Sequence, residues 1–306
     1  MIGLTLKHLR YFDALARHGH FGRAAEACGI SQPALSVQIK ELEAMLGAPL
    51  VERAARQLRL TALGDEIRQR AGKILVAVEE LGALSRSAKG PLGGQLRLGV
   101  IPTVAPYLLP QIMTALAERM PDLDLLPRES VTRALIADLL DARLDAAIVA
   151  LPISEPALQE FALFDENFVL IRPVREAGRP VPSPESLQGM KLLLLEEGHC
   201  FRDQALSFCA ITPSRTRTLM EGSSLSTLVQ MVGAGMGVTL LPEMALPLET
   251  RAAAVSVSHF PAPAPSRRIG MVWRKSNPLA DKLMELGAIV RQVGSPAISR
   301  RPHTKA

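Results

Sequence analysis

The stretch GISQPALSVQIKELEAMLG (residues 29–47) decides the fold of the N-terminal part of the chain. Ser31 is a good helix N-cap, Pro33 suits the first helical turn, and Gly47 suits the position after a helix end. Residues 6–28 carry two shorter apolar stripes before a tight turn at Gly29. Helices joined by such a turn predict a helix-turn-helix. The stripe that marks the last helix consists of Leu35, Ile39, Leu42 and Leu46.

The other face of this helix is polar, and residues 50–60 alternate like a hairpin with a basic tip. Any amphipathic helix turns polar residues outward, so periodicity alone leaves DNA binding and a merely solvated face equally open. The basic hairpin favours DNA, because arginine neutralises phosphate whereas amides and hydroxyls contact base edges. The candidate DNA-contacting residues are Ser31, Gln32, Pro33, Ser36, Gln38, Lys40, Arg53 and Arg56.

Charge is unevenly placed along this 306-residue chain, whose front and short tail are basic and whose body is slightly acidic. Residues 1–90 hold 13 Lys and Arg against 9 Asp and Glu, whereas residues 91–290 hold 18 against 21. A basic front and a slightly acidic body indicate an anionic partner for the front alone. An aromatic content of 4% argues against a stacking surface for single-stranded nucleic acid.

The compartment is predicted from three further features. We see neither a signal peptide at the N-terminus nor a run of 18 apolar residues, so no membrane association is expected. Three cysteines are too few for a disulfide framework. A reducing compartment follows, in which a disulfide forms for sensing rather than for structure.

The remaining chain divides into a linker and an α/β region. Residues 61–87 show a long helical pattern, and a Gly- and Pro-containing hinge follows it. From residue 95 strands and helices alternate, which predicts a parallel sheet covered by helices on both faces. The predicted domains are residues 1–60 for DNA binding, 61–90 for linker and dimerisation, and 91–306 for regulation.

Cys200 and Cys209 are the most informative residues of the body. Cys200 lies between His199 and Arg202, whose positive charges would favour the reactive thiolate, and a short helix is predicted to begin near it. Nine residues of helix rise about 13.5 Å. A disulfide needs Cα atoms about 4.4–6.8 Å apart, so joining the pair requires the helix to unwind. The simpler alternative is a buried thiol that acts as a small hydrophobe, and Cys28 fits that reading.

Several motifs together resemble the LysR-type transcriptional regulators, up to about residue 293. They are Ala24-Ala25 and the stretch 31–43, Val51-Glu52-Arg53 with Leu60-Thr61, and Gly235–Pro242. Within that family, the stretch 198–205 with a second cysteine nine residues after Cys200 is similar to the hydrogen peroxide-sensing subgroup. The stretch 101–110 is similar to the same subgroup.

The resemblance implies an α/β fold of defined parts. An N-terminal winged helix-turn-helix and a long linker helix would precede a two-subdomain, periplasmic-binding-protein-like α/β regulatory domain. Subdomain I would comprise about residues 91–166 and 267–293, and subdomain II about 167–266. The tail 294–306 is expected to be disordered.

The resemblance also implies roles and partners. Cys200 would be the peroxidatic thiol and Cys209 the resolving thiol, beside a peroxide pocket of Thr103, Thr132, His199, Arg202 and Asp203. The protein would act as a homotetramer, a dimer of dimers, on double-stranded promoter DNA with RNA polymerase. A thiol reductant such as glutaredoxin or thioredoxin would reset it, and we expect no cofactor, no metal and no enzymatic turnover.

Two alternatives remain open at this point. In the first, the chain is a metabolite-sensing regulator of the same fold, and its cysteines are incidental. In the second, it is a thiol peroxidase, although residues 6–60 then have no role. A screen for effectors distinguishes the first from a peroxide sensor, and a steady-state peroxidase assay distinguishes the second.

Overall fold

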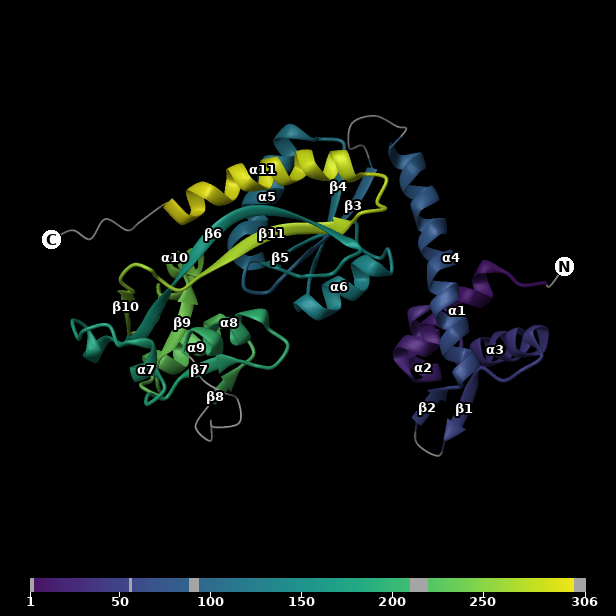
Figure 1. Ribbon diagram of the computed structural model, residues 1–306, viewed down its shortest axis with the longest axis horizontal. Coiled ribbons are helices and arrows are strands. Elements are labelled where there is room, and N and C mark those ends of the chain that lie inside the picture. Colours follow the sequence, from purple (N-terminus) through teal and green to yellow (C-terminus); the bar gives the residue numbers. More distant parts are fainter. Residues whose placement is uncertain (1–2, 55–56, 88–93, 210–219, 300–306) are drawn as a thin grey trace. The chain divides into compact units, whose positions relative to one another are not determined.

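The computed structural model describes residues 3–54, 57–87, 94–209 and 220–299 (Figure 1). The chain forms two compact units, residues 1–85 and 86–306. Each unit has a core of its own, so we describe them separately.

The N-terminal unit is the predicted winged helix-turn-helix. Its helices are α1 (Leu6–His18), α2 (Phe21–Ala27) and α3 (Gln32–Leu46), followed by the antiparallel hairpin of β1 (Val51–Ala54) and β2 (Gln57–Leu60). The long helix α4 (Ala62–Ser87) comes next. The Ser31 hydroxyl accepts a hydrogen bond from the Ala34 amide, and Gly47 ends α3 at a φ of +72°, as the sequence predicts. The core includes Phe12, Leu15, Ala24, Leu35, Ile39, Leu42 and Leu50.

The main sheet of the regulatory unit has the strand order β10-β6-β11-β5-β3-β4, with β9 paired to β6. Its parallel part is made of β3 (Gly94–Val100), β4 (Leu123–Glu129) and β5 (Ala146–Leu151). In Figure 1, α5 (Ala105–Arg119) and α11 (Ala280–Ser299) lie on one side of this sheet and α6 (Thr132–Leu140) lies on the other.

The prediction of a wholly parallel sheet is wrong. β11 (Ser266–Arg274) runs antiparallel to both of its neighbours, β5 and β6 (Leu158–Pro173). β6 also pairs antiparallel with β9 (Thr239–Pro242) and β10 (Val255–His259). Alternation of strands and helices predicts parallel strands because a helix crosses between them, whereas no helix is described between β5 and β6 or between β10 and β11, so the pattern does not predict the directions of β6 and β11.

A second cluster of elements surrounds the far half of β6. It contains α7 (Pro184–Leu187), α8 (Cys200–Phe208), α9 (Leu225–Gly233) and α10 (Leu246–Glu249), with the short parallel pair β7 (Leu193–Leu195) and β8 (Met220–Gly222). Two 3-10 turns complete it at Val174–Glu176 and Glu243–Ala245. β6 pairs with β11 up to Asn167 and with β9 and β10 beyond it. The proposed subdomain bounds stay a prediction.

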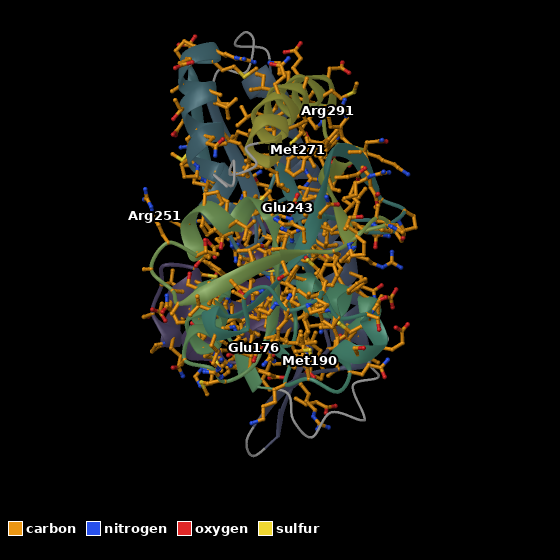
Figure 2. All side chains as sticks on the ribbon, turned by 90° about the vertical axis from the view of Figure 1, so that its left-hand side faces the viewer. Glu176, Met190, Glu243, Arg251, Met271 and Arg291 are labelled. Atoms are coloured by element: carbon orange, nitrogen blue, oxygen red, sulfur yellow. The ribbon has the colours of Figure 1, made fainter. Side chains whose placement is uncertain are left out.

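The last helix is longer than predicted. We expect disorder from residue 294, but α11 continues to Ser299. The reason is packing. Gly294 is buried against the Phe164 ring, and Gly287 lies so close to the sheet that a Cβ there would be 3.1 Å from the methyl carbon of Met271. Met271 of β11 is fully buried, and Figure 2 labels Arg291 of α11 above it. Residues 300–306 lie outside the described part of the chain.

Candidate functional site

Four predicted residues meet at one small recess of the regulatory unit. Cys200 is the first residue of α8 and His199 is its N-cap, and both are half-buried. Thr103 is buried behind the end of β3, and Thr132 opens α6. The side chains around the recess leave no room for a water molecule between them, so an organic metabolite does not fit there. The lining of the recess consists of Ile101, Pro102, Thr103, Val131, Thr132, His199 and Cys200.

Neighbouring parallel strands of the main sheet, β3 and β4, explain why Thr103 and Thr132 meet, whereas Cys200 comes from the separate sheet of β7 and β8. Thr103 follows β3, Thr132 follows β4, and Cys200 follows β7, each after the carboxyl end of its strand. Sites in α/β sheets form at these ends, where helix N-termini point inward. Cys200 is the first residue of α8, so it lies at the end of the helix that carries the partial positive charge.

The two threonines supply polar groups to the recess. The Thr132 hydroxyl is buried and has no hydrogen-bond partner among the described residues. The Thr103 hydroxyl accepts a hydrogen bond of 2.8 Å from Arg267 Nη1, which leaves its own proton available for another acceptor. A buried polar group without a partner is costly, so the Thr132 hydroxyl is suited to a small polar guest.

Arg267 supports this site, and the sequence reasoning missed it. Its side chain is fully buried, pairs with Glu166 at 2.8 Å, and donates to both the hydroxyl and the carbonyl of Thr103. The sequence held a signal: Arg267 and Arg268 are adjacent in a strand, so they point to opposite faces and one of them enters the interior.

The positive charges expected around Cys200 are placed differently from the prediction. Burial lowers the pKa of His199 below its ordinary value of 6.5, so its imidazole is neutral at pH 7. Arg202 directs its guanidinium to the Leu195 carbonyl at 2.8 Å and to Glu221 at 2.7 Å. It therefore anchors α8 to β7 and β8. A neutral His199 still offers one ring N–H as a donor.

Asp203 also lies outside the recess lining. It is exposed and lines a separate open cavity of about 420 Å³. Successive helical residues are about 100° apart around the axis, so Arg202, two residues after Cys200, points to roughly the opposite side of α8. The other residues of that cavity are Phe168, Gln204, Ser207, Phe208, Pro265 and Ser266.

Cys209 lies at the opposite end of α8, which confirms the predicted helix between the cysteines. It caps that end, is fully buried, and is a free thiol, as is Cys200. Burial raises the pKa of Cys209 to about 11, so its sulfur is protonated at neutral pH. Nine helical residues separate the Cα atoms by about 13.5 Å, well beyond disulfide range. Cys28 packs half-buried against the core of the N-terminal unit, and burial raises its pKa too.

The predicted DNA-contacting residues of α3 lie at its surface. Ser31, Gln32, Pro33 and Lys40 are exposed, and Ser36 and Gln38 are half-buried. The Gln38 amide donates to Glu41 at 2.6 Å. Val37 is 52% exposed between these polar residues. The sequence analysis missed it, and an apolar side chain there matches a thymine methyl.

The wing is described only in its strands. Arg53 belongs to β1, paired with Leu58, but its side chain is outside the described part. Arg56 lies outside the described residues altogether. Their roles on DNA therefore stay predictions.

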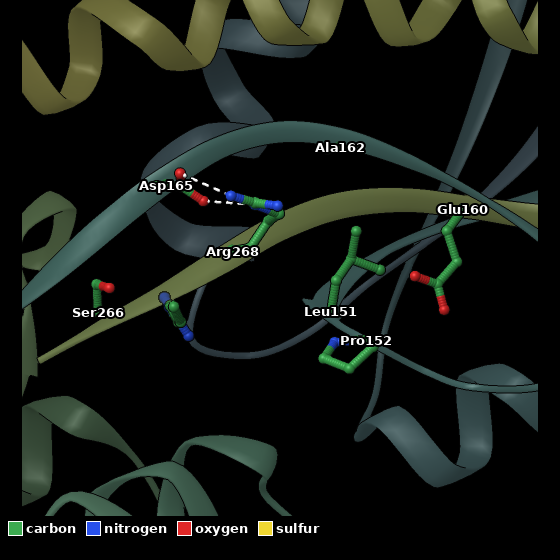
Figure 3. A pocket seen from close by; sticks show the side chains of 8 residues that line it. Leu151, Pro152, Glu160, Ala162, Asp165, Ser266 and Arg268 are labelled. Atoms are coloured by element: carbon green, nitrogen blue, oxygen red, sulfur yellow. Dashed lines mark hydrogen bonds and ion pairs between the residues drawn. The ribbon is translucent and has the colours of Figure 1, made fainter.

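A larger cavity of about 590 Å³ bears on the metabolite alternative (Figure 3). It lies against β5, β6 and β11, and two of its lining residues are arginines. Arg268 holds Asp165 in a bidentate pair, and Arg267 holds Glu166. Both cations already have carboxylate partners, so neither is available to an organic acid without breaking an ion pair.

Two kinds of feature are not found among the described residues. None of their helices is long and apolar enough to cross a membrane. Three or more His, Cys, Asp or Glu side chains arranged as metal ligands are not found among them.

Fold and site define a class of proteins, and comparison with known families supports it. The model of the LysR substrate binding domain matches residues 89–295. The model of the bacterial regulatory helix-turn-helix protein of the lysR family matches residues 6–65. The chain belongs to the LysR family of bacterial transcriptional regulators.

Within that family the chain is similar to peroxide-responsive members. It is 42% identical over 292 residues to a probable hydrogen peroxide-inducible genes activator of Streptomyces viridosporus, with 94% of both chains covered. It is 39% identical to the DNA-binding transcriptional dual regulator OxyR of Escherichia coli K12, with 94% of this chain and 95% of that protein covered.

Solved structures agree with this likeness. A full-length OxyR variant of Pseudomonas aeruginosa, with cysteine changed to aspartate, superposes with a TM-score of 0.72 at 36% identity, covering 99% of both chains. A peroxide-bound OxyR variant of Corynebacterium glutamicum, with cysteine changed to serine, gives a TM-score of 0.67 at 36% identity, covering 96% of this chain and 94% of that one.

Proposed function

We propose that this chain is a hydrogen peroxide-sensing transcriptional activator that switches through a reversible disulfide between Cys200 and Cys209. The observation that carries the proposal is the arrangement of α8. It holds one cysteine at its N-terminus, at a narrow polar recess lined by Thr103, Thr132 and His199, and buries the other at its C-terminus. The peroxide-responsive relatives support the same function.

The first chemical step takes place in the recess. The Cys200 thiolate attacks one peroxide oxygen, the O–O bond breaks, and hydroxide leaves as Cys200 becomes a sulfenic acid. Thr103, Thr132 and the neutral ring of His199 are the donors that hold the peroxide and stabilise charge on the departing oxygen.

The second step joins the cysteines. The Cys209 sulfur attacks the Cys200 sulfenic sulfur, the S–O bond breaks, and water leaves. Because α8 keeps the sulfurs apart, the bond forms only when the helix unwinds. The oxidised unit is then held in a second conformation, and a dithiol reductant such as thioredoxin or glutaredoxin resets it.

The DNA-binding unit transmits the change. We infer that Ser31, Gln32, Pro33, Ser36, Gln38 and Lys40 of α3, with Arg53 and Arg56 of the wing, contact promoter DNA. A cytoplasmic homotetramer, a dimer of dimers, would shift the spacing of its recognition helices and contact RNA polymerase. Half-sites must lie about one or more helical turns apart to be bound together, so spacing controls binding. The chain would react once for each reduction, as a sensor rather than an enzyme.

Transcription in vitro tests this function. Promoter fragments are selected from genomic DNA by the purified, reduced protein and transcribed with RNA polymerase before and after hydrogen peroxide. We expect peroxide to raise transcription with the wild-type protein and to have no effect with Cys200→Ser, which still binds the fragments. An equal rise with Cys200→Ser would refute the thiol mechanism.

A further inference from the structure

The two ends of α8 are held by contacts of different strength. At its N-terminal end, Arg202 makes two bonds with a charged donor, to the Leu195 carbonyl and to Glu221. Phe201 of the same turn packs edge-on against Phe168 of β6, with ring centroids 5.0 Å apart. Hydrogen bonds with a charged donor are roughly twice as strong as neutral ones, so this end is firmly anchored.

Among the described residues, the contacts identified for the C-terminal end are neutral. Gln188, directly after α7, donates a 3.1 Å hydrogen bond from its side-chain amide to the backbone carbonyl of Cys209. Phe208 packs edge-on against Phe260, with centroids 5.1 Å apart. The last carbonyls of a helix have no partner within the helix, so Gln188 satisfies a group that otherwise needs water or another cap.

This difference identifies the end that opens. Forming the disulfide requires α8 to come apart, and the weaker contacts break first. Opening at the C-terminal end releases Cys209 from its buried position while Cys200 stays in the recess with the groups that hold peroxide.

We propose that Gln188 is a positioning residue that retains Cys209 in the reduced state and sets the rate of disulfide closure. This inference rests on the proposed function. It concerns only the second step, in which the Cys200–Cys209 S–S bond forms, the S–O bond of the sulfenic acid breaks, and water leaves with the Cys209 proton. Hydrogen peroxide, consumed in the first step, is the sole oxidant.

Two substitutions test this role. Gln188→Ala removes the side chain beyond Cβ, and Gln188→Glu keeps its shape but replaces the donor amide by a carboxylate, which cannot donate. Gln111→Ala is the matched control, because Gln111 makes the same kind of bond, from its amide to the Tyr107 carbonyl at 3.0 Å, on a different helix.

The measurement is rapid-quench mass spectrometry of the reduced full-length protein with hydrogen peroxide. Dimedone traps the sulfenic acid, so the two steps are timed separately. We expect both Gln188 variants to close the disulfide roughly two- to tenfold faster, which corresponds to the loss of one neutral hydrogen bond. Formation of the sulfenic acid should keep its wild-type rate, and Gln111→Ala should change neither step.

The outcomes separate this inference from the proposed function. Wild-type closure rates in both Gln188 variants would overturn the role of Gln188 and leave the sensor intact. A parallel change in both steps would also overturn it, because a general loosening of the fold affects sulfenic acid formation as well. If the wild-type protein forms no Cys200–Cys209 bond, the proposed function itself fails.

Discussion

The Thr132 hydroxyl is buried without a partner among the described residues, and this carries a cost that a guest would relieve. Thr132→Val removes that hydroxyl. We expect folding stability to stay the same or to rise by up to about 1 kcal/mol. The reaction with peroxide should slow by about ten- to a hundredfold, because the departing oxygen then has one donor fewer.

Chemical denaturation and stopped-flow oxidation measure the two effects. Thr114→Val is the matched control, since the Thr114 hydroxyl already donates to the Pro110 carbonyl at 3.1 Å, away from the recess. A loss of both stability and rate in Thr132→Val would show that this hydroxyl is an ordinary structural group.

Cys209 makes stability depend on alkaline pH. Burial raises the pKa of its thiol from 9.0 to about 11, so the folded protein keeps a proton that the unfolded chain releases. The raised pKa of Cys209 therefore contributes to the free energy of unfolding in full below pH 9, and this contribution is lost as the pH rises towards 11. Between these values the free energy of unfolding should fall by about 2 kcal/mol more in the reduced wild-type protein than in Cys209→Ala. Urea titrations across this range test it, and identical slopes would contradict it.

Helix α8 shows how far the sequence predicts the site. Its N-terminus at Cys200 follows from local signals, whereas the meeting of Thr103, Thr132 and Cys200 is implied only by the family resemblance. The orientation of Arg202 does not, because its partners Leu195 and Glu221 come from separate strands, β7 and β8. The sequence places a positive charge near Cys200, and only the tertiary structure identifies the partners of that charge.

The same distinction applies to β6 and β11. The apolar run Phe168–Arg172 predicts a strand, whereas the mixed sequence of Leu158–Asn167 does not, although it forms the first part of β6. That part is stabilised by pairing with β11, about a hundred residues away. A local sequence pattern does not predict pairing between strands that are so far apart in the chain. The helix-turn-helix, by contrast, is built from caps and stripes within a few residues of one another.

The contacts by which Arg202 holds α8 to β7 and β8 lead to a prediction about stability. Arg202→Met removes the bonds to Leu195 and Glu221 while keeping the apolar stem. We expect a decrease of about 1–3 kcal/mol in stability, measured by urea denaturation, whereas Arg133→Met at an exposed site on α6 should have little effect. If Arg202→Met leaves stability unchanged and instead abolishes the reaction of Cys200 with iodoacetamide, Arg202 acts on the thiolate directly.

Over the whole molecule, residues 1–90 contribute +4 of the net charge of +5. Binding to promoter DNA should therefore weaken steeply with salt, mainly through this part of the chain. Lys40→Ala on α3 should lower affinity for all sequences alike and reduce the slope of log K against log salt by about 0.9 for each phosphate that is no longer neutralised. Lys191→Ala, at an exposed position of the regulatory unit, is the control and should leave the slope unchanged. Fluorescence anisotropy at several salt concentrations measures this slope. Equal slopes for wild type and Lys40→Ala would show that Lys40 does not contact a DNA phosphate.

The reduced fold keeps two free thiols at opposite ends of α8, and peroxide sensing requires that oxidation joins them. To test this, the reduced full-length protein is treated with one equivalent of hydrogen peroxide and followed by intact and peptide mass spectrometry. We expect a mass decrease of about two hydrogens within seconds, mapped to a Cys200–Cys209 bridge. Slow oxidation spread over several residues, with both thiols still free, would refute the disulfide switch.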